Sequence, residues 1–106
     1  MLFVTLIYSL TNKLPKEESF GLISQIRRSS VSIPSNIAEG YGRNSSNDYI
    51  RFLQISIGSL YELQTQLEIC LNLKYVSQQR FDDINEKSRE IERMLSSLIN
   101  KINPKR

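Results

Sequence analysis

The 106-residue sequence has no histidine, no tryptophan and a single cysteine, Cys70. It therefore lacks the usual ligands of structural zinc, haem and iron-sulfur centres, and it cannot form a disulfide within the chain. We expect neither a metal nor a cofactor. Cys70 lies on an apolar helical stripe, which favours a thiol packed in the core over a reactive one.

The absence of histidine also removes the commonest general base, and a nucleophile needs a base within hydrogen-bonding reach. Asn36 and Glu39 resemble an active-site pair, but no nucleophile-base pair can be assembled without histidine, and Asn36 is expected to bond a neighbouring helix. Gly40 and Gly42 follow a helical pattern rather than a strand, so they do not match a phosphate-binding loop or a dinucleotide fingerprint. The sequence predicts a protein without enzymatic activity.

No stretch alternates apolar and polar residues for long enough to form a strand, and no apolar run is long enough to span a bilayer. The apolar N-terminus, MLFVTLIYSL, lacks the basic region and the cleavage site of a signal peptide, so it fits an amphipathic helix. We expect a cytoplasmic protein that does not contact membranes. The length indicates one domain, residues 1–106, with a single modest core.

Apolar residues recur at helical spacing in four segments, which predicts helices over residues 2–13, 19–41, 46–72 and 78–102. Pro15 ends the first helix, Pro104 follows the fourth, and Ser45 and Ser77 can cap the third and fourth. Four helices with short connections indicate an all-α, antiparallel up-down four-helix bundle. The first helix reaches roughly 18 Å and the later ones about 35 Å, so it cannot cover their full length.

The second helix contains Pro34, which has no backbone N–H to donate and clashes with the carbonyl of Ser30. The apolar spacing continues in phase across Pro34, so we expect a proline-kinked helix rather than a helix end. Gly40 and Gly42 can adopt the left-handed conformation of a C-cap, and we expect them to end this helix.

The third helix has more apolar surface than one buried stripe needs. Its main stripe contains Tyr49, Leu53, Leu60, Leu63, Leu67 and Cys70. Its first half adds apolar side chains around most of the remaining circumference, and small residues there allow another helix to approach closely. We interpret this surplus as a subunit contact made by Ile50, Phe52, Ile55, Ile57 and Gly58.

Arg27 and Arg28 have no acidic residue three or four positions away, whereas Arg43 can pair with Glu39 in this way. Unpaired guanidinium groups suit a nucleic acid backbone, because they bind phosphate in a bidentate manner. The alternative is that Arg27 and Arg28 pair with acidic residues of the fourth helix, in the same or a neighbouring subunit. Tyrosines 41, 49 and 61 could stack on bases, but packing in a core or an interface is favoured.

The segments LPKEESFGLISQIRRSSVSIPSNIAEGYGR and SSNDYIRFLQISIGSLYELQTQL together resemble the four-helix-bundle family encoded within intervening sequences of bacterial large-subunit ribosomal RNA. The resemblance runs from the first residues to about Ile102 and is most specific between residues 25 and 43. That family is in turn similar to the accessory variability proteins of diversity-generating retroelements. Those proteins are pentameric bundles with a basic surface that bind nucleic acid and a reverse transcriptase.

The resemblance implies a homo-oligomer, with a pentamer as the expected state, and a basic surface formed by Arg27, Arg28, Arg43 and Arg51. It assigns no enzymatic activity. Family members usually begin about ten residues earlier, with a longer first helix that often carries a tryptophan, and this chain departs from that pattern. Two hypotheses follow. The first is an oligomeric bundle that binds RNA or DNA; the second is a scaffold that assembles with itself and a partner protein, such as a reverse transcriptase, without binding nucleic acid.

Overall fold

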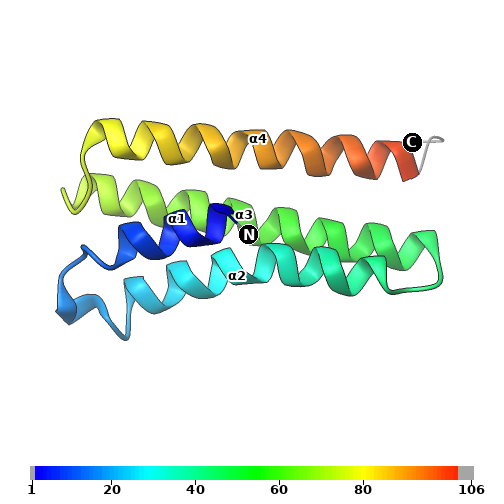
Figure 1. The fold of residues 1–106 in the computed structure, drawn as a ribbon, viewed down its shortest axis with the longest axis horizontal. Coiled ribbons are helices and arrows are strands. Elements are labelled where there is room, and N and C mark those ends of the chain that lie inside the picture. Colours follow the sequence, from blue (N-terminus) through cyan, green and yellow to red (C-terminus); the bar gives the residue numbers. More distant parts are fainter. Residues whose placement is uncertain (1, 103–106) are drawn as a thin grey trace.

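The computed structural model of the chain describes residues 2–102 and is an antiparallel bundle of α-helices, without strands in that range (Figure 1). The elements are α1 (Leu2–Thr11), the 3₁₀ turn η1 (Lys16–Glu18), α2 (Leu22–Tyr41), α3 (Ser46–Asn72) and α4 (Gln78–Ile102). The helices run alternately up and down the long axis of a body of 45 × 24 × 19 Å. The predicted all-α, up-down four-helix bundle is confirmed. Pro104 lies outside the described residues.

The predicted N-caps of the last two helices are present. The Ser45 hydroxyl accepts a 3.1 Å hydrogen bond from the backbone N–H of Asp48, and the Ser77 hydroxyl accepts one of 3.1 Å from Arg80. Each serine oxygen satisfies one of the backbone donors that a helix leaves unpaired in its first turn. The observed bounds of α3 and α4 agree with the predicted ones.

The connection between α1 and α2 differs from the prediction, because residues 16–18 form a separate 3₁₀ turn. The backbone N–H and the hydroxyl of Ser19 both donate to the carbonyl of Lys16, at 3.0 and 2.7 Å, and close this turn. As a result α1 ends at Thr11 rather than at residue 13, and α2 begins at Leu22 rather than at residue 19.

The prediction that Gly40 and Gly42 adopt the left-handed conformation is wrong. Gly42 caps α2 with a φ of −79°, and no glycine in residues 2–102 has a positive φ. Gly40 lies inside α2, where that helix comes close to α3. A Cβ atom at Gly40 would lie 2.7 Å from the Cβ of Phe52 and 3.0 Å from Cδ1 of Tyr49. This position therefore needs glycine for close approach and not for backbone freedom.

The left-handed residue is Lys74, at the end of α3, with a φ of 65°. The backbone N–H of Tyr75 donates to the carbonyl of Cys70 at 2.9 Å, and that of Lys74 donates to Leu71 at 3.0 Å. These two bonds define a Schellman motif, in which glycine is the usual residue at the position of Lys74.

The second helix continues without interruption through Pro34, as the apolar phasing predicted. One turn of it is held from outside, since the hydroxyl of Ser56 on α3 donates a buried 2.9 Å hydrogen bond to the carbonyl of Ile33. A bend of the helix axis at Pro34 stays a prediction.

The core has two parts along the long axis, because α1 begins near the middle of the bundle (Figure 1). The part that α1 covers contains the fully buried Ile7, Leu10, Ile26, Leu63 and Leu67. Cys70 is also buried there, as predicted. The other part has only three helices around it, and its buried residues come from α3 and α4: Ile50, Leu53, Leu95 and Ile99.

In the part of the chain that the structure describes, no helix is long and apolar enough to cross a membrane. Residues 2–102 also contain no group of three histidine, cysteine or carboxylate side chains that could hold a metal ion.

Candidate nucleic-acid interface

Arg27 joins α2 to α1. Its Nε atom donates a 2.8 Å hydrogen bond to the hydroxyl of Thr11, and its Nη2 atom donates one of 2.8 Å to the side-chain oxygen of Asn12. The guanidinium also lies over the ring of Tyr8, 4.5 Å from its centroid. All three contacts are with neutral groups, so Arg27 keeps an uncompensated charge while it holds α1 in place. Two hydrogen bonds and a cation-π contact of this kind are worth roughly 1–3 kcal/mol together.

Arg28 is exposed and makes no hydrogen bond or ion pair with residues 2–102. It lines a cavity of about 180 Å³ between α2 and α3, together with Gln25, Ser29, Ser32, Ser59 and Glu62. Within the chain, the predicted pairing of Arg27 and Arg28 with α4 is contradicted. The acidic side chains of α4 that form ion pairs do so with arginines of their own helix, Glu86 with Arg93 and Glu92 with Arg89. Pairing with α4 of a neighbouring subunit stays a prediction.

Arg43 directly follows the C-terminal end of α2, about 22 Å from Arg28 at 1.5 Å per residue, and Arg51 lies in the first turns of α3. Their guanidinium groups lie 5.0 and 4.7 Å from the centroid of the Phe52 ring. Arg43 forms the predicted ion pair with Glu39, in the last turn of α2, at 2.7 Å. Arg51 is 3.7 Å from its intrahelical partner, Asp48. The four candidate arginines therefore form two separate groups, and only the group of Arg27 and Arg28 is without carboxylate partners among the described residues.

The residues proposed as a subunit contact also fall into two groups, one in the core of the chain and one on its surface. Ile50 is 8% exposed and belongs to the core of its own chain, and Ile57 packs against that core. Phe52 is half-buried beneath the two arginines. Ile55, which is 42% exposed, and Gly58, whose missing side chain would meet nothing within 4 Å, lie on the outer surface of α3. Further along this surface Ile69 and Leu73 are also exposed, and the sequence analysis did not single them out.

A largely apolar groove marks the length that α1 does not cover. One part, of about 140 Å³, begins at Phe3 and Val4 in the first turn of α1 and continues between α2 and α4. A second part, of about 320 Å³, is lined by Pro34, Ile37, Ala38, Tyr41 and Tyr49. Tyr41, which lines the second part, is 77% exposed, and its ring meets that of Tyr49 edge to face with centroids 6.0 Å apart. The described chain thus leaves open the apolar face of α2 that was expected to be packed.

Small polar side chains line the contact between α2 and α3. The hydroxyls of Ser32 and Ser59 are 2.8 Å apart, and Ser29 donates a 3.2 Å hydrogen bond to Oε1 of Glu62. The amide nitrogen of Asn36 donates to the carbonyl and the hydroxyl of Ser32, at 2.8 and 2.9 Å. Asn36 therefore bonds its own helix, and the prediction of a bond to a neighbouring helix is wrong. Serine allows the two backbones to approach closely, and each hydroxyl that enters the contact finds a partner.

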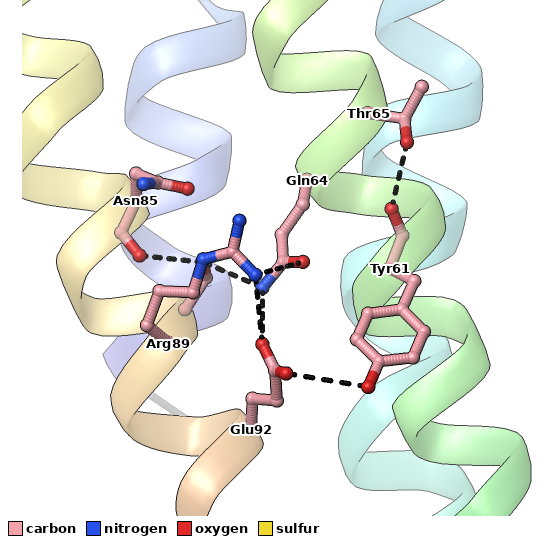
Figure 2. A network of polar contacts seen from close by, with 7 residues as sticks. Tyr61, Gln64, Thr65, Asn85, Arg89 and Glu92 are labelled. Atoms are coloured by element: carbon pink, nitrogen blue, oxygen red, sulfur yellow. Dashed lines mark hydrogen bonds and ion pairs between the residues drawn. The ribbon is translucent and has the colours of Figure 1, made fainter.

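A second polar network joins α3 to α4 (Figure 2). The buried amide of Gln64 donates to Ser88 and to Glu92, both at 3.2 Å, and its oxygen accepts a 3.2 Å bond from Arg89. Arg89 and the hydroxyl of Tyr61 also donate to Glu92, at 3.1 and 3.4 Å. These donors, with Gln64 foremost, lower the pKa of Glu92. The network is complete, and it involves none of the four candidate arginines.

These features define an all-α, up-down four-helix bundle with a short first helix, a polar cavity lined by Arg28, and a neighbouring Arg27 that also has no carboxylate partner among the described residues. The sequence pattern of the 23S rRNA-intervening sequence protein matches residues 1–97, and the chain belongs to this family. Its fold is also that of a crystal structure from Bacteroides thetaiotaomicron VPI-5482, described as a protein of unknown function from the S23 ribosomal protein family. The two share 33% sequence identity, with 92% of this chain and 91% of that one covered and a TM-score of 0.85. No curated protein matches the sequence.

Proposed function

We propose that this protein is a non-enzymatic, oligomeric bundle that binds RNA through the surface at Arg27 and Arg28. The observation that supports this most is the absence of a carboxylate partner for either guanidinium among residues 2–102. In contrast, Arg43 and Arg51 each have such a partner. Unpaired arginines on a helix surface can exchange water and counterions for phosphate oxygens, and the released counterions drive binding.

Oligomerisation would increase the total positive charge presented to a nucleic acid. One chain has a formal net charge of +3. A pentamer, the state that the family resemblance implies, would have about +15 and a correspondingly larger attraction for a polyanion. Exposed apolar residues on α3, Ile55 and Ile69 among them, and the groove beyond the first turn of α1 are surfaces that subunits could cover.

Fluorescence anisotropy with a labelled, structured RNA tests the proposal. Affinity should fall by at least about tenfold between 50 and 200 mM salt, because the release of counterions becomes less favourable as the salt concentration rises. Arg28→Glu should weaken binding at low salt by a similar factor. Arg28 is preferred to Arg27 for this test since its side chain makes no contact that supports the fold.

Arg51→Glu is the matched control, because it changes the net charge of the chain by the same amount at an exposed arginine in the other group. Circular dichroism should show that both variants retain the helix content of the wild type. Equal loss of affinity in the two variants would show that overall charge matters and the site does not. Binding that is insensitive to both salt and Arg28→Glu would exclude the proposal.

The second candidate function is a protein-interaction scaffold, and the exposed Ile55 and Ile69 on the outer surface of α3 favour it. Here the assembly depends on apolar surface and the arginines are irrelevant. Ile55→Asp should lower the mass of the oligomer in light scattering, whereas Gln54→Asp, at the exposed neighbouring position, should not. Ile50→Asp is unsuited to this test, because Ile50 is buried in the core of its own chain and the variant would unfold.

A further inference from the structure

The cavity between α2 and α3 contains two opposite charges that do not pair with each other. Arg28 and Glu62 both line it, yet Arg28 makes no ion pair with any described residue. An exposed ion pair contributes little to stability, so these two charges can stay apart and keep their hydrogen-bonding groups for a ligand. Here they stand on different helices, on two sides of a space of about 180 Å³, which is the volume of roughly six water molecules.

The hydrogen-bonding groups of this cavity are only partly used. Glu62 accepts one bond, from Ser29 to its Oε1 atom, and its Oε2 atom accepts none. The N–H donors of Arg28 and the amide of Gln25 are all unused. Ser32 and Ser59 share one hydrogen bond, so whichever hydroxyl donates it, the proton of the other is left. One wall of the cavity therefore accepts hydrogen bonds and the other donates them.

This arrangement selects against simple ions. A free phosphate inside the cavity would meet the carboxylate of Glu62, unlike a backbone phosphate that approaches the exposed Arg28 from outside, and a metal cation or an amine in the cavity would meet the guanidinium of Arg28. The fitting ligand is neutral and planar, with adjacent donors on one edge and adjacent acceptors on another. Among the RNA bases guanine has this pattern: N1–H and the N2 amino group are donors, and O6 and N7 are acceptors.

We propose that the cavity between α2 and α3, lined by Gln25, Arg28, Ser29, Ser32, Ser59 and Glu62, binds an unpaired guanine base of RNA. Glu62 accepts from N1–H and the N2 amino group, while Arg28 donates to O6 and N7. Proteins read unpaired bases on these edges when loops and single strands expose them. The inference rests on the RNA binding proposed above and gives it a preferred base.

Short uridine-rich RNAs with one central guanosine, adenosine or inosine test the site by anisotropy at fixed salt. The guanosine RNA should bind at least about tenfold more tightly than the adenosine RNA, the discrimination expected of one bidentate base contact. Inosine, which lacks the N2 amino group, should fall between them. Glu62→Gln should remove the preference for guanosine, since an amide cannot accept both donors. Glu68→Gln, on the exposed surface of the same helix, is the control and should keep it.

The free nucleoside separates this inference from the proposed function. Guanosine carries no phosphate, so its binding, followed by NMR shifts at Ser32 and Ser59, reports on the cavity alone, and adenosine should cause no such shifts. Equal affinity for the guanosine and adenosine RNAs, or a preference that survives Glu62→Gln, would overturn the inference. If salt-sensitive binding that requires Arg28 remained in that case, the proposed function would still stand. Guanosine shifts without any RNA binding would support the cavity and exclude the wider function.

Discussion

Replacing the two helical glycines Gly40 and Gly58 with alanine, one at a time, should change stability in opposite directions. Alanine is favoured over glycine inside a helix by about 1 kcal/mol. At Gly58 nothing opposes this gain, because the added Cβ would have no neighbour within 4 Å. At Gly40 the added Cβ would lie 2.7 Å from the Cβ of Phe52, and neither atom is at the end of a flexible side chain. Separating α2 from α3 to relieve such overlap costs about 1–3 kcal/mol.

The free energy of unfolding should therefore rise by about 1 kcal/mol for Gly58→Ala and fall by about 1–2 kcal/mol for Gly40→Ala, which lies in the last turn of α2 and gains less from propensity. Urea denaturation followed by circular dichroism measures both changes. It should be repeated at several protein concentrations, since the stability of an oligomer depends on concentration. An unchanged slope against urea would show that the variants unfold over the same surface.

Either glycine can refute the reasoning. If Gly40→Ala is as stable as the wild type, α2 and α3 do not approach as closely as the structure has them. If Gly58→Ala is destabilised and the loss shrinks as the protein is diluted, Gly58 is covered by another subunit, as the sequence predicted, because the contact stabilises only the associated chains. A loss at Gly58 that does not depend on concentration would contradict both the open surface and the subunit contact.

Three further predictions follow from single positions. Lys74→Gly should raise the free energy of unfolding by up to about 1 kcal/mol in urea denaturation, because a left-handed φ costs an L-residue about 1–2 kcal/mol, while Lys74→Ala should give no gain. Burial raises the pKa of the Cys70 thiol to about 11, so iodoacetamide at pH 8 should alkylate it slowly in the folded protein and quickly in urea. Folding lowers the pKa of Glu92, so the carboxylate stabilises the folded state above the ordinary pKa of 4.5 and loses this contribution to stability as the pH falls through the folded pKa. The urea midpoint should therefore drop more steeply in acid for the wild type than for Glu92→Gln.

Local sequence signals accounted for much of the fold, since they depend on neighbours along the chain. Ser45 and Ser77 stand directly before apolar helical patterns, and each caps the helix it was expected to cap. The position of Arg27 could not be found in this way. Its partners are Thr11, the last residue of α1, and Asn12, which follows it, and only the packing of α1 on α2 brings them within 2.8 Å.

Apolar residues around a helix show how much surface is to be buried, but not which neighbour buries it. Ile50 and Ile55 both belonged to the surplus on α3, yet α4 covers the first and leaves the second 42% exposed. Tyr41 continues the apolar face of α2, but α1 begins too far along the bundle to reach it. The role of Gly40 could not be predicted from its sequence neighbours either, because the close approach there depends on how Phe52 of α3 packs against α2.

The use of serine between α2 and α3 explains why a polar site can exist there at all. An apolar seam would repel water and leave no donors, whereas hydroxyls that pair across the seam hold the register and still carry a spare proton. The hydroxyl of Ser56 donates to the carbonyl of Ile33, and that of Ser29 donates to Glu62. These two hydrogen bonds hold α2 and α3 together beside the cavity. Removing the Ser29 hydroxyl should therefore free Glu62 to swing across to Arg28 and close the cavity with an ion pair. In Ser29→Ala, guanosine binding should fall although neither Arg28 nor Glu62 has been changed. The affinity for RNA should also depend less on salt, because Arg28 is then paired with Glu62.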